Sequence, residues 1–196
     1  LWYIDRVDFG VNYQDFAAFW GRLFSWEGRS PLYGNQHLVK PLTWISTAVL
    51  LLPALALLAR RSWEDLSRQQ VMAEFGLLLT AVLLCQNQSA IHAFFLLAIP
   101  LAAATMCVRE LEPEGRRFWL LSGGIAAAWC LVALPFGFRE EALWHGWLML
   151  AVSSKLYGGL ILWAVLLWIV SRQVRGGAEA PGVASGGEAA EDVSLK

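Results

Sequence analysis

Long apolar stretches alternate with short polar islands along most of this chain. Two of the stretches, 41–59 and 118–136, contain no charged residue and are each about 19 residues long. A helix needs about 20 residues to cross roughly 30 Å of hydrocarbon. Because backbone amides in lipid must be hydrogen-bonded within their own segment, such stretches must be helical. The pattern therefore predicts an all-α, polytopic membrane helix bundle.

The complete pattern predicts about five transmembrane helices. The second contains Glu74 near its start, and the third is interrupted by Pro100, which neighbouring helices can accommodate in a membrane. Residues 139–155 are expected to form an interfacial helix, because a single span over 147–170 would bury Lys155 about 12 Å along its axis. The expected spans are 41–59, 71–87, 90–108, 118–136 and 156–171.

The expected bundle, 41–172, lies between two segments of different composition. Residues 173–196 are rich in Gly, Ala, Glu and Ser and are predicted to form a disordered tail. Residues 1–40 are polar and aromatic, and they are predicted to form an outward loop containing an interfacial amphipathic helix.

The apolar side chains of that short helix recur at positions i, i+3, i+4, i+7 and i+8. Asn12 is a plausible N-cap, with Asp15 three positions later, and Arg22 is expected on the opposite face. The helix either lies flat at the membrane interface or packs on neighbouring helices as ordinary core, and the sequence leaves both open. The apolar face comprises Phe16, Phe19, Trp20, Leu23 and Phe24.

The distribution of arginine predicts the orientation of the bundle. With five spans, eight arginines fall on one side, whereas the opposite loops 85–92 and 137–146 contain only Arg139. By the positive-inside rule we expect the arginine-rich loops and the tail to be cytoplasmic, in a cell (inner) membrane. Residues 1–40, 85–92 and 137–155 then face outward. The eight are Arg60, Arg61, Arg68, Arg109, Arg116, Arg117, Arg172 and Arg175.

Composition narrows the classes of partner and cofactor. Only 16% of residues are charged, and the net charge of −1 gives no reason to expect a nucleic-acid partner. The three cysteines have no C-x-x-C spacing and are interpreted as buried thiols. No metal or other cofactor is expected, because the chain contains no zinc signature and no phosphate-binding Gly-rich loop. The pairs Gly123-Gly124 and Gly158-Gly159 are interpreted as close-packing points between helices.

Two outward islands contain the candidate site residues. Amide and imidazole groups at the membrane surface can hydrogen-bond sugar hydroxyls or a phosphate without the desolvation cost of full charges. Polar side chains at this depth are costly and are therefore candidates for function, although they can instead cap helix ends. The first island supplies Asn35, Gln36 and His37, and the second supplies Asn87, Gln88, Ser89 and His92.

The same islands resemble a known enzyme family. Gly34-Asn35-Gln36-His37-Leu38, just before an apolar span, resembles the Gly-Asn-Gln-Ser-Leu element of glycosyltransferase family 87, which belongs to the C superfamily. Ser89 and His92 match that family's Ser-Pro-x-Ser-Trp-x-His stretch. The resemblance covers roughly residues 12–172. The chain departs from it at His37 (Ser in the family), at Gln86-Asn87 (Ser-Pro) and at Ala90 (Trp).

The resemblance implies transfer of a hexose, typically mannose, from a polyprenyl-phosphate donor to a lipid or glycan acceptor on the outer face. In that superfamily the catalytic acidic residue lies in an N-terminal outward loop, which nothing here matches. No catalytic residue is therefore assigned, and the chain, which begins at Leu1 rather than Met, is expected to be the C-terminal part of a longer enzyme. The alternative is a non-enzymatic transporter or membrane-complex subunit. In either case membrane lipids are expected partners.

Overall fold

The computed structural model describes residues 15–25, 27, 29–60, 67–86, 91–109, 115–133 and 146–178. Within these ranges the side chains of residues 91–93, 148, 149, 152 and 175–178 are not described. The predictions for residues 1–14, for residues 139–145 and for the tail after 178 therefore lie outside the described residues.

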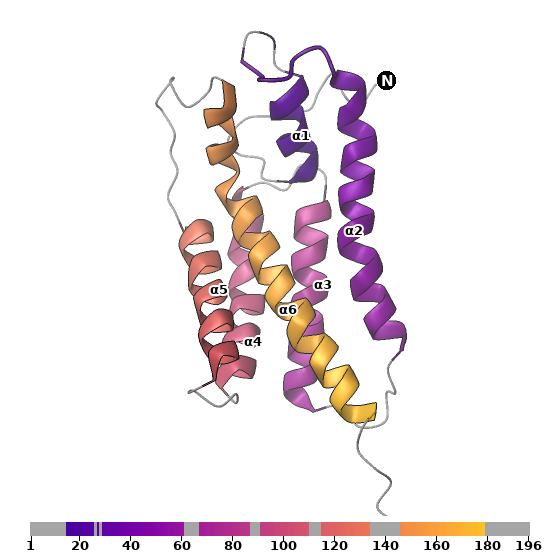
Figure 1. Ribbon diagram of the computed structural model, residues 1–196, viewed down its shortest axis with the longest axis vertical. Coiled ribbons are helices and arrows are strands. Elements are labelled where there is room, and N and C mark those ends of the chain that lie inside the picture. The colour runs from indigo at the N-terminus through magenta and orange to yellow at the C-terminus, as the bar shows by residue number, and fades with distance from the viewer. Residues whose placement is uncertain are drawn as a thin grey trace, which may run out of the picture.

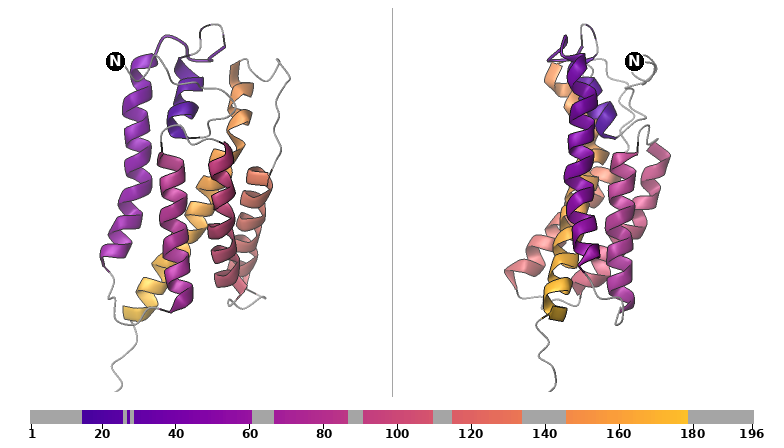
Figure 2. Two further views of the ribbon diagram at one scale, coloured as in Figure 1. Left: turned by 180° about the vertical axis from the view of Figure 1, so that it is seen from behind. Right: turned by 90° about the vertical axis from the view of Figure 1, so that its right-hand side faces the viewer.

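The described part of the chain is helical and contains no strand, which confirms the predicted all-α class. The helices run up and down in a bundle, and the short α1 sits above the ends of α3 and α4, beside the upper half of α2 (Figures 1 and 2). In order they are α1 (Phe16–Phe24), η2 (Gln36–Leu38), α2 (Val39–Ala59), α3 (Arg68–Cys85), η3 (Ile91–Leu97), α4 (Ala98–Arg109), α5 (Arg116–Ala133), η5 (Gly146–Ser153) and α6 (Ser154–Ala178).

Three of the described helical segments are long and apolar enough to cross a membrane, judged by length and composition. They are Gln36–Ala59, Arg68–Cys85 and Ser154–Val174, and Phe94–Arg109 is a shorter apolar helix. They overlap the first, second and fifth predicted spans, with bounds that differ by a few residues. The total of five spans stays a prediction.

The third predicted span, 90–108, is not one uniform helix where the structure describes it. Its first part is the 3-10 helix η3, and the α-helix α4 begins only at Ala98. Pro100 is the third residue of α4, where its missing N–H leaves no hydrogen bond unmade, because the first four amides of a helix have no partner within it. The proline therefore lies in the first turn of the α-helical part of this segment, directly after η3.

Helix α6 crosses the bundle diagonally and contacts α2, α3, α4 and α5 (Figure 1). Glycines permit the closest of these approaches: a Cβ at Gly158 would lie 2.9 Å from the Ala128 carbonyl oxygen of α5, and one at Gly159 would lie 2.7 Å from Leu84 Cδ2 of α3. Gly124 of α5 likewise faces Val165. These three positions confirm the predicted role of the glycine pairs, whereas nothing lies within 4 Å of a Cβ at Gly123.

Both ends of α6 differ from the predicted span 156–171. The helix continues to Ala178, so residues 173–178, assigned to the tail from composition, are helical. At the other end η5 leads directly into α6, and Lys155 lies in its first turn. The Lys155 ammonium donates to the Val132 carbonyl oxygen at 2.6 Å, at the C-terminal end of α5. The charge is thus accommodated at a helix end, where carbonyls lack partners.

The predicted amphipathic helix exists as α1, and two details of its prediction are wrong. Its N-cap is Asp15 rather than Asn12, and the Asp15 carboxylate accepts a hydrogen bond from the Ala18 amide at 2.8 Å. Arg22, expected on the polar face, is fully buried. Helix α1 packs against α2 and η5, as the core alternative expects, and its position relative to the membrane stays a prediction.

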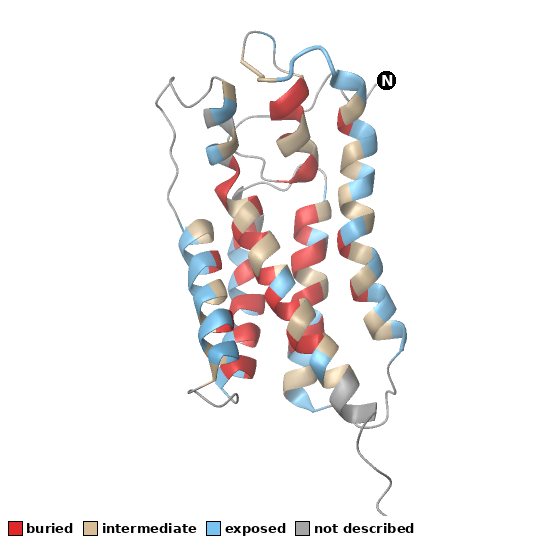
Figure 3. Ribbon diagram, in the orientation of Figure 1, coloured by how far each residue is buried: buried red, intermediate tan, exposed pale blue. Residues whose placement is uncertain are grey.

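Burial is concentrated at the centre of the bundle, while the outer faces of α2 and α5 are largely exposed (Figure 3). The structure also gathers many arginines at one end, where α2, α4 and α6 finish and α3 and α5 begin (Figure 1). We call this the arginine end, and the opposite end, which holds residues 30–38, the loop end. The arginines there whose side chains are described are Arg60, Arg68, Arg109, Arg116, Arg117 and Arg172.

Candidate functional site

The first predicted island forms an exposed turn at the loop end. Gly34 has a φ of +101°, a conformation that favours glycine, and it directs the chain into η2 and α2. The side chains of Asn35, Gln36 and His37 are all exposed. Asn35 Nδ2 donates to the Leu32 carbonyl oxygen at 3.2 Å, across the turn. The structure therefore presents two side-chain amides and an imidazole in succession at the start of an apolar span.

Three hydrogen bonds hold this turn against the rest of the bundle. The Leu32 amide donates to the Leu23 carbonyl oxygen at 3.0 Å, and the Ser30 hydroxyl donates to the Arg22 carbonyl oxygen at 2.6 Å. The Gly146 amide donates to the Arg29 carbonyl oxygen at 2.9 Å. The turn is thus bonded to the end of α1 and to the start of η5, so its position depends on both.

A buried polar cluster below the turn connects α1 to η5, directly before α6. The Arg22 guanidinium donates from Nη1 to the Ser153 hydroxyl oxygen at 2.8 Å, and both residues are fully buried. Asp15 is also buried, and the Tyr157 hydroxyl donates to the Leu150 carbonyl oxygen at 3.0 Å. A buried charge is tolerated only where hydrogen bonds and opposite charge compensate its lost hydration.

The electrostatics of Arg22 reflect this burial. Desolvation lowers its pKa to about 10, and the opposing influences of Asp15 and then Tyr157 favour the charged form. The guanidinium therefore remains protonated at neutral pH. Arg22 is a structural cation that fixes α1, rather than a group poised to exchange protons.

Aromatic contacts complete the attachment of α1. Trp20 Nε1 donates to the Ser46 hydroxyl oxygen of α2 at 3.1 Å, and the Trp20 ring stacks on Phe24 with centroids 6.2 Å apart. On the other side Phe19 meets Tyr157 of α6 edge to face at 6.2 Å. Helix α1 is thus hydrogen-bonded to α2 and η5 and packs on Tyr157 of α6, and these contacts determine where the exposed turn lies.

The second predicted island cannot be placed in the same way. Asn87, Gln88 and Ser89 lie outside the described residues, and His92 is described only by its backbone, within η3. The structure therefore brings together the three residues of the first island. Whether the other four lie beside them stays a prediction.

Sequence reasoning missed the buried cluster of Asp15, Arg22 and Ser153. One signal could have revealed part of it: Asp15 and Arg22 are seven residues apart, which places them on the same face of a helix two turns apart. Asp15 was instead interpreted only as the partner of a cap. The long-range bond to Ser153 has no sequence signal.

No metal centre is outlined by the described residues, since they contain no group of three or more His, Cys, Asp or Glu side chains that could hold an ion. The described cavities lie elsewhere, between α2 and α6 and between α4 and α5. No protein-family model, curated protein or solved structure matches the chain.

Proposed function

We propose that this chain belongs to a membrane hexosyltransferase that uses a polyprenyl-phosphate sugar, with mannose as the expected hexose. The observation that supports it is the exposed succession Asn35, Gln36 and His37 at the first turn of an apolar span. The proposal also rests on the resemblance of Gly34–Leu38 to the family 87 element. The turn would lie at the outer face.

The chemistry of the turn suits recognition of a sugar phosphate at a membrane surface. Amides donate and accept hydrogen bonds, as sugar hydroxyls do, and an exposed imidazole can donate to a phosphate oxygen. A polyprenyl chain would remain in lipid while its headgroup reached the turn. A turn held by three backbone-directed bonds loses little freedom when it binds, which favours affinity.

In the proposed reaction the acceptor hydroxyl loses its proton to a base, and its oxygen attacks the anomeric carbon of the donor. The bond from that carbon to the phosphate oxygen breaks, and the polyprenyl phosphate leaves with the electron pair. Asn35, Gln36 and His37 would bind and orient the donor, as would Asn87, Gln88, Ser89 and His92. The base is not assigned to a residue of this chain.

The test measures transfer of radiolabelled mannose from polyprenyl-phosphate mannose in membranes containing the full-length protein. Gln36→Ala and His37→Ala should each lower kcat/KM about 3–10-fold, the effect of losing one hydrogen bond. These side chains are exposed, so the fold should survive. Arg68→Ala, an exposed change at the arginine end, is the control and should transfer normally. Wild-type turnover in both loop variants, at equal protein levels, would contradict the assignment.

A second candidate function is a non-enzymatic membrane-complex subunit or transporter, and one observation favours it. Within an 18-residue apolar stretch of each span, only 11% is buried for α2, against 44% for α3 and 50% for α6. Exposed apolar residues such as Trp44, Val49 and Leu52 leave α2 free to pack on another helix. Specific crosslinking from Val49→Cys to another protein, together with no transfer activity in the full-length protein, would select this alternative.

A further inference from the structure

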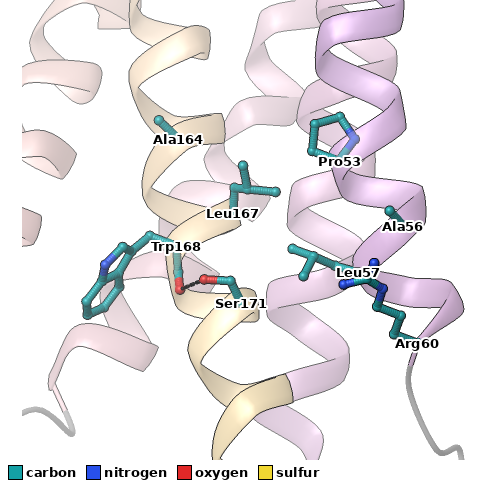
Figure 4. Close-up of a pocket in the computed structure, with 8 residues that line it drawn as sticks. All are labelled: Pro53, Ala56, Leu57, Arg60, Ala164, Leu167, Trp168 and Ser171. Atoms are coloured by element: carbon teal, nitrogen blue, oxygen red, sulfur yellow. Dashed lines mark hydrogen bonds between the residues drawn. The ribbon is translucent and has the colours of Figure 1, made fainter.

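A groove of about 520 Å³ separates the lower halves of α2 and α6 (Figure 4). Pro53 and Ala164 lie toward the centre of the bundle, and Arg60 and Ser171 lie toward the arginine end. Ala56 and Ala164 are small, so the two helices do not fill the space between them. The complete lining is Pro53, Ala56, Leu57, Arg60, Ala164, Leu167, Trp168 and Ser171.

The lining is apolar along its length and cationic at one end. Arg60 is the charged residue among those that line the groove, and it is exposed. The Ser171 hydroxyl is already bonded to the Trp168 carbonyl oxygen at 2.8 Å. The Arg172 guanidinium lies 4.8 Å from the centre of the Trp168 ring, so it is held on α6. Arg60 is therefore the cation best placed to meet an anion at the mouth.

We propose that this groove binds an anionic glycerophospholipid, with an acyl chain between α2 and α6 and the phosphate at Arg60. Basic pockets between transmembrane helices suit anionic lipid headgroups, because each arginine near the membrane surface attracts them. The apolar lining matches the acyl chain of such a lipid, and the arginine at one end matches its anionic headgroup. This proposal does not depend on the proposed transferase activity, whose site lies at the loop end.

The size of the groove suits a narrow occupant. A transmembrane helix is 10–12 Å wide and about 30 Å long, so the groove could receive only some of its side chains and not the helix itself. An acyl chain is narrow enough to enter laterally from the bilayer. The second described groove, between α4 and α5, is about 590 Å³, and its lining is likewise largely apolar and includes one arginine, Arg109. It provides an internal comparison.

The experiment uses the full-length protein, purified and stripped of lipid. Native mass spectrometry then follows binding of phosphatidylglycerol and of phosphatidylcholine with identical chains. The wild type should bind phosphatidylglycerol more tightly. Arg60→Gln should weaken the tightest phosphatidylglycerol step about fivefold, the effect expected for one arginine, and leave phosphatidylcholine unchanged. Arg109→Gln should leave that step unchanged.

A second variant tests binding of the lipid's acyl chain rather than of its headgroup. Ala164→Phe should fill the groove and weaken both lipids about tenfold, equivalent to losing contact with about two methylene groups. Ala127→Phe, an exposed position on α5 outside both grooves, is the matched control. If Ala164→Phe does not fold, Arg60→Gln alone still decides, because Arg60 is exposed.

Three results would overturn the proposal. The first is equal binding of the two lipids by the wild type. The second is loss of the tightest step in Arg109→Gln but not in Arg60→Gln, which would place the lipid in the other groove. The third is a protein dimer that Ala164→Phe disrupts while lipid binding stays the same, which would make the groove a contact between copies of the chain.

Discussion

The contact between α5 and α6 at Gly158 gives the sharpest prediction of stability. Replacing Gly158 by alanine would put a Cβ 2.9 Å from the Ala128 carbonyl oxygen and 2.8 Å from Val132 Cγ2. Real Cβ contacts are longer, so something must move. The carbonyl belongs to the α5 backbone and cannot rotate away as a side chain would. Relief therefore requires α5 and α6 to separate.

The magnitude follows from two opposing terms. Overpacking of this kind costs about 1–3 kcal/mol, whereas glycine to alanine inside a helix gains about 1 kcal/mol. Gly123→Ala gains the helix-propensity term without the overpacking cost, because nothing lies within 4 Å of its new Cβ. The difference in the free energy of unfolding between the two variants therefore isolates the steric term, about 1–3 kcal/mol. Gly159→Ala should fall between them, because the atom it meets is the movable end of Leu84.

The assay is reversible unfolding in mixed detergent–SDS micelles, followed by far-UV circular dichroism on the three single variants and the wild type. The order of stability should be Gly123→Ala, then Gly159→Ala, then Gly158→Ala. If Gly158→Ala is as stable as Gly123→Ala within about 0.5 kcal/mol, the packing of α6 on α5 described here is wrong.

Three further changes test other parts of the bundle. Arg22→Met should lower the free energy of unfolding by about 3–5 kcal/mol in the same assay, because it leaves the buried polar groups of Asp15 and Ser153 uncompensated. Adding Asp15→Asn should restore part of this loss. A double variant no more stable than Arg22→Met would argue against electrostatic coupling between them. Lys155→Met should lower the free energy of unfolding by about 1–2 kcal/mol and speed amide hydrogen exchange at the end of α5, because the Val132 carbonyl loses its partner. Unchanged exchange there would contradict the capping role of Lys155. Gly34→Ala should cost about 1 kcal/mol from its positive φ alone, since no atom obstructs the new Cβ, and equal unfolding free energies would show that the turn adjusts freely.

The helical class and several helix positions could be predicted from the sequence alone. Residues 41–59 lie within α2 and the expected span 156–171 lies within α6. The prediction succeeds because lipid leaves the backbone no other way to satisfy its amides, so an uninterrupted apolar stretch determines a helix. The exposed positions of Asn35, Gln36 and His37 also agree with the polar island in which they were found.

The burial of Arg22 and the contacts of the glycines could not be predicted from the sequence, because they depend on which residues meet across the bundle. Arg22 was expected on the polar face from its helical spacing, yet Ser153, far along the chain, offers a hydrogen bond that lets the guanidinium be buried. Gly123 and Gly124 are neighbours in the sequence, and only the approach of α6 distinguishes them. Composition thus determined that the chain forms apolar helices with polar turns. The tertiary structure decided which polar groups are buried and which faces touch, because these depend on partners brought together from distant parts of the chain.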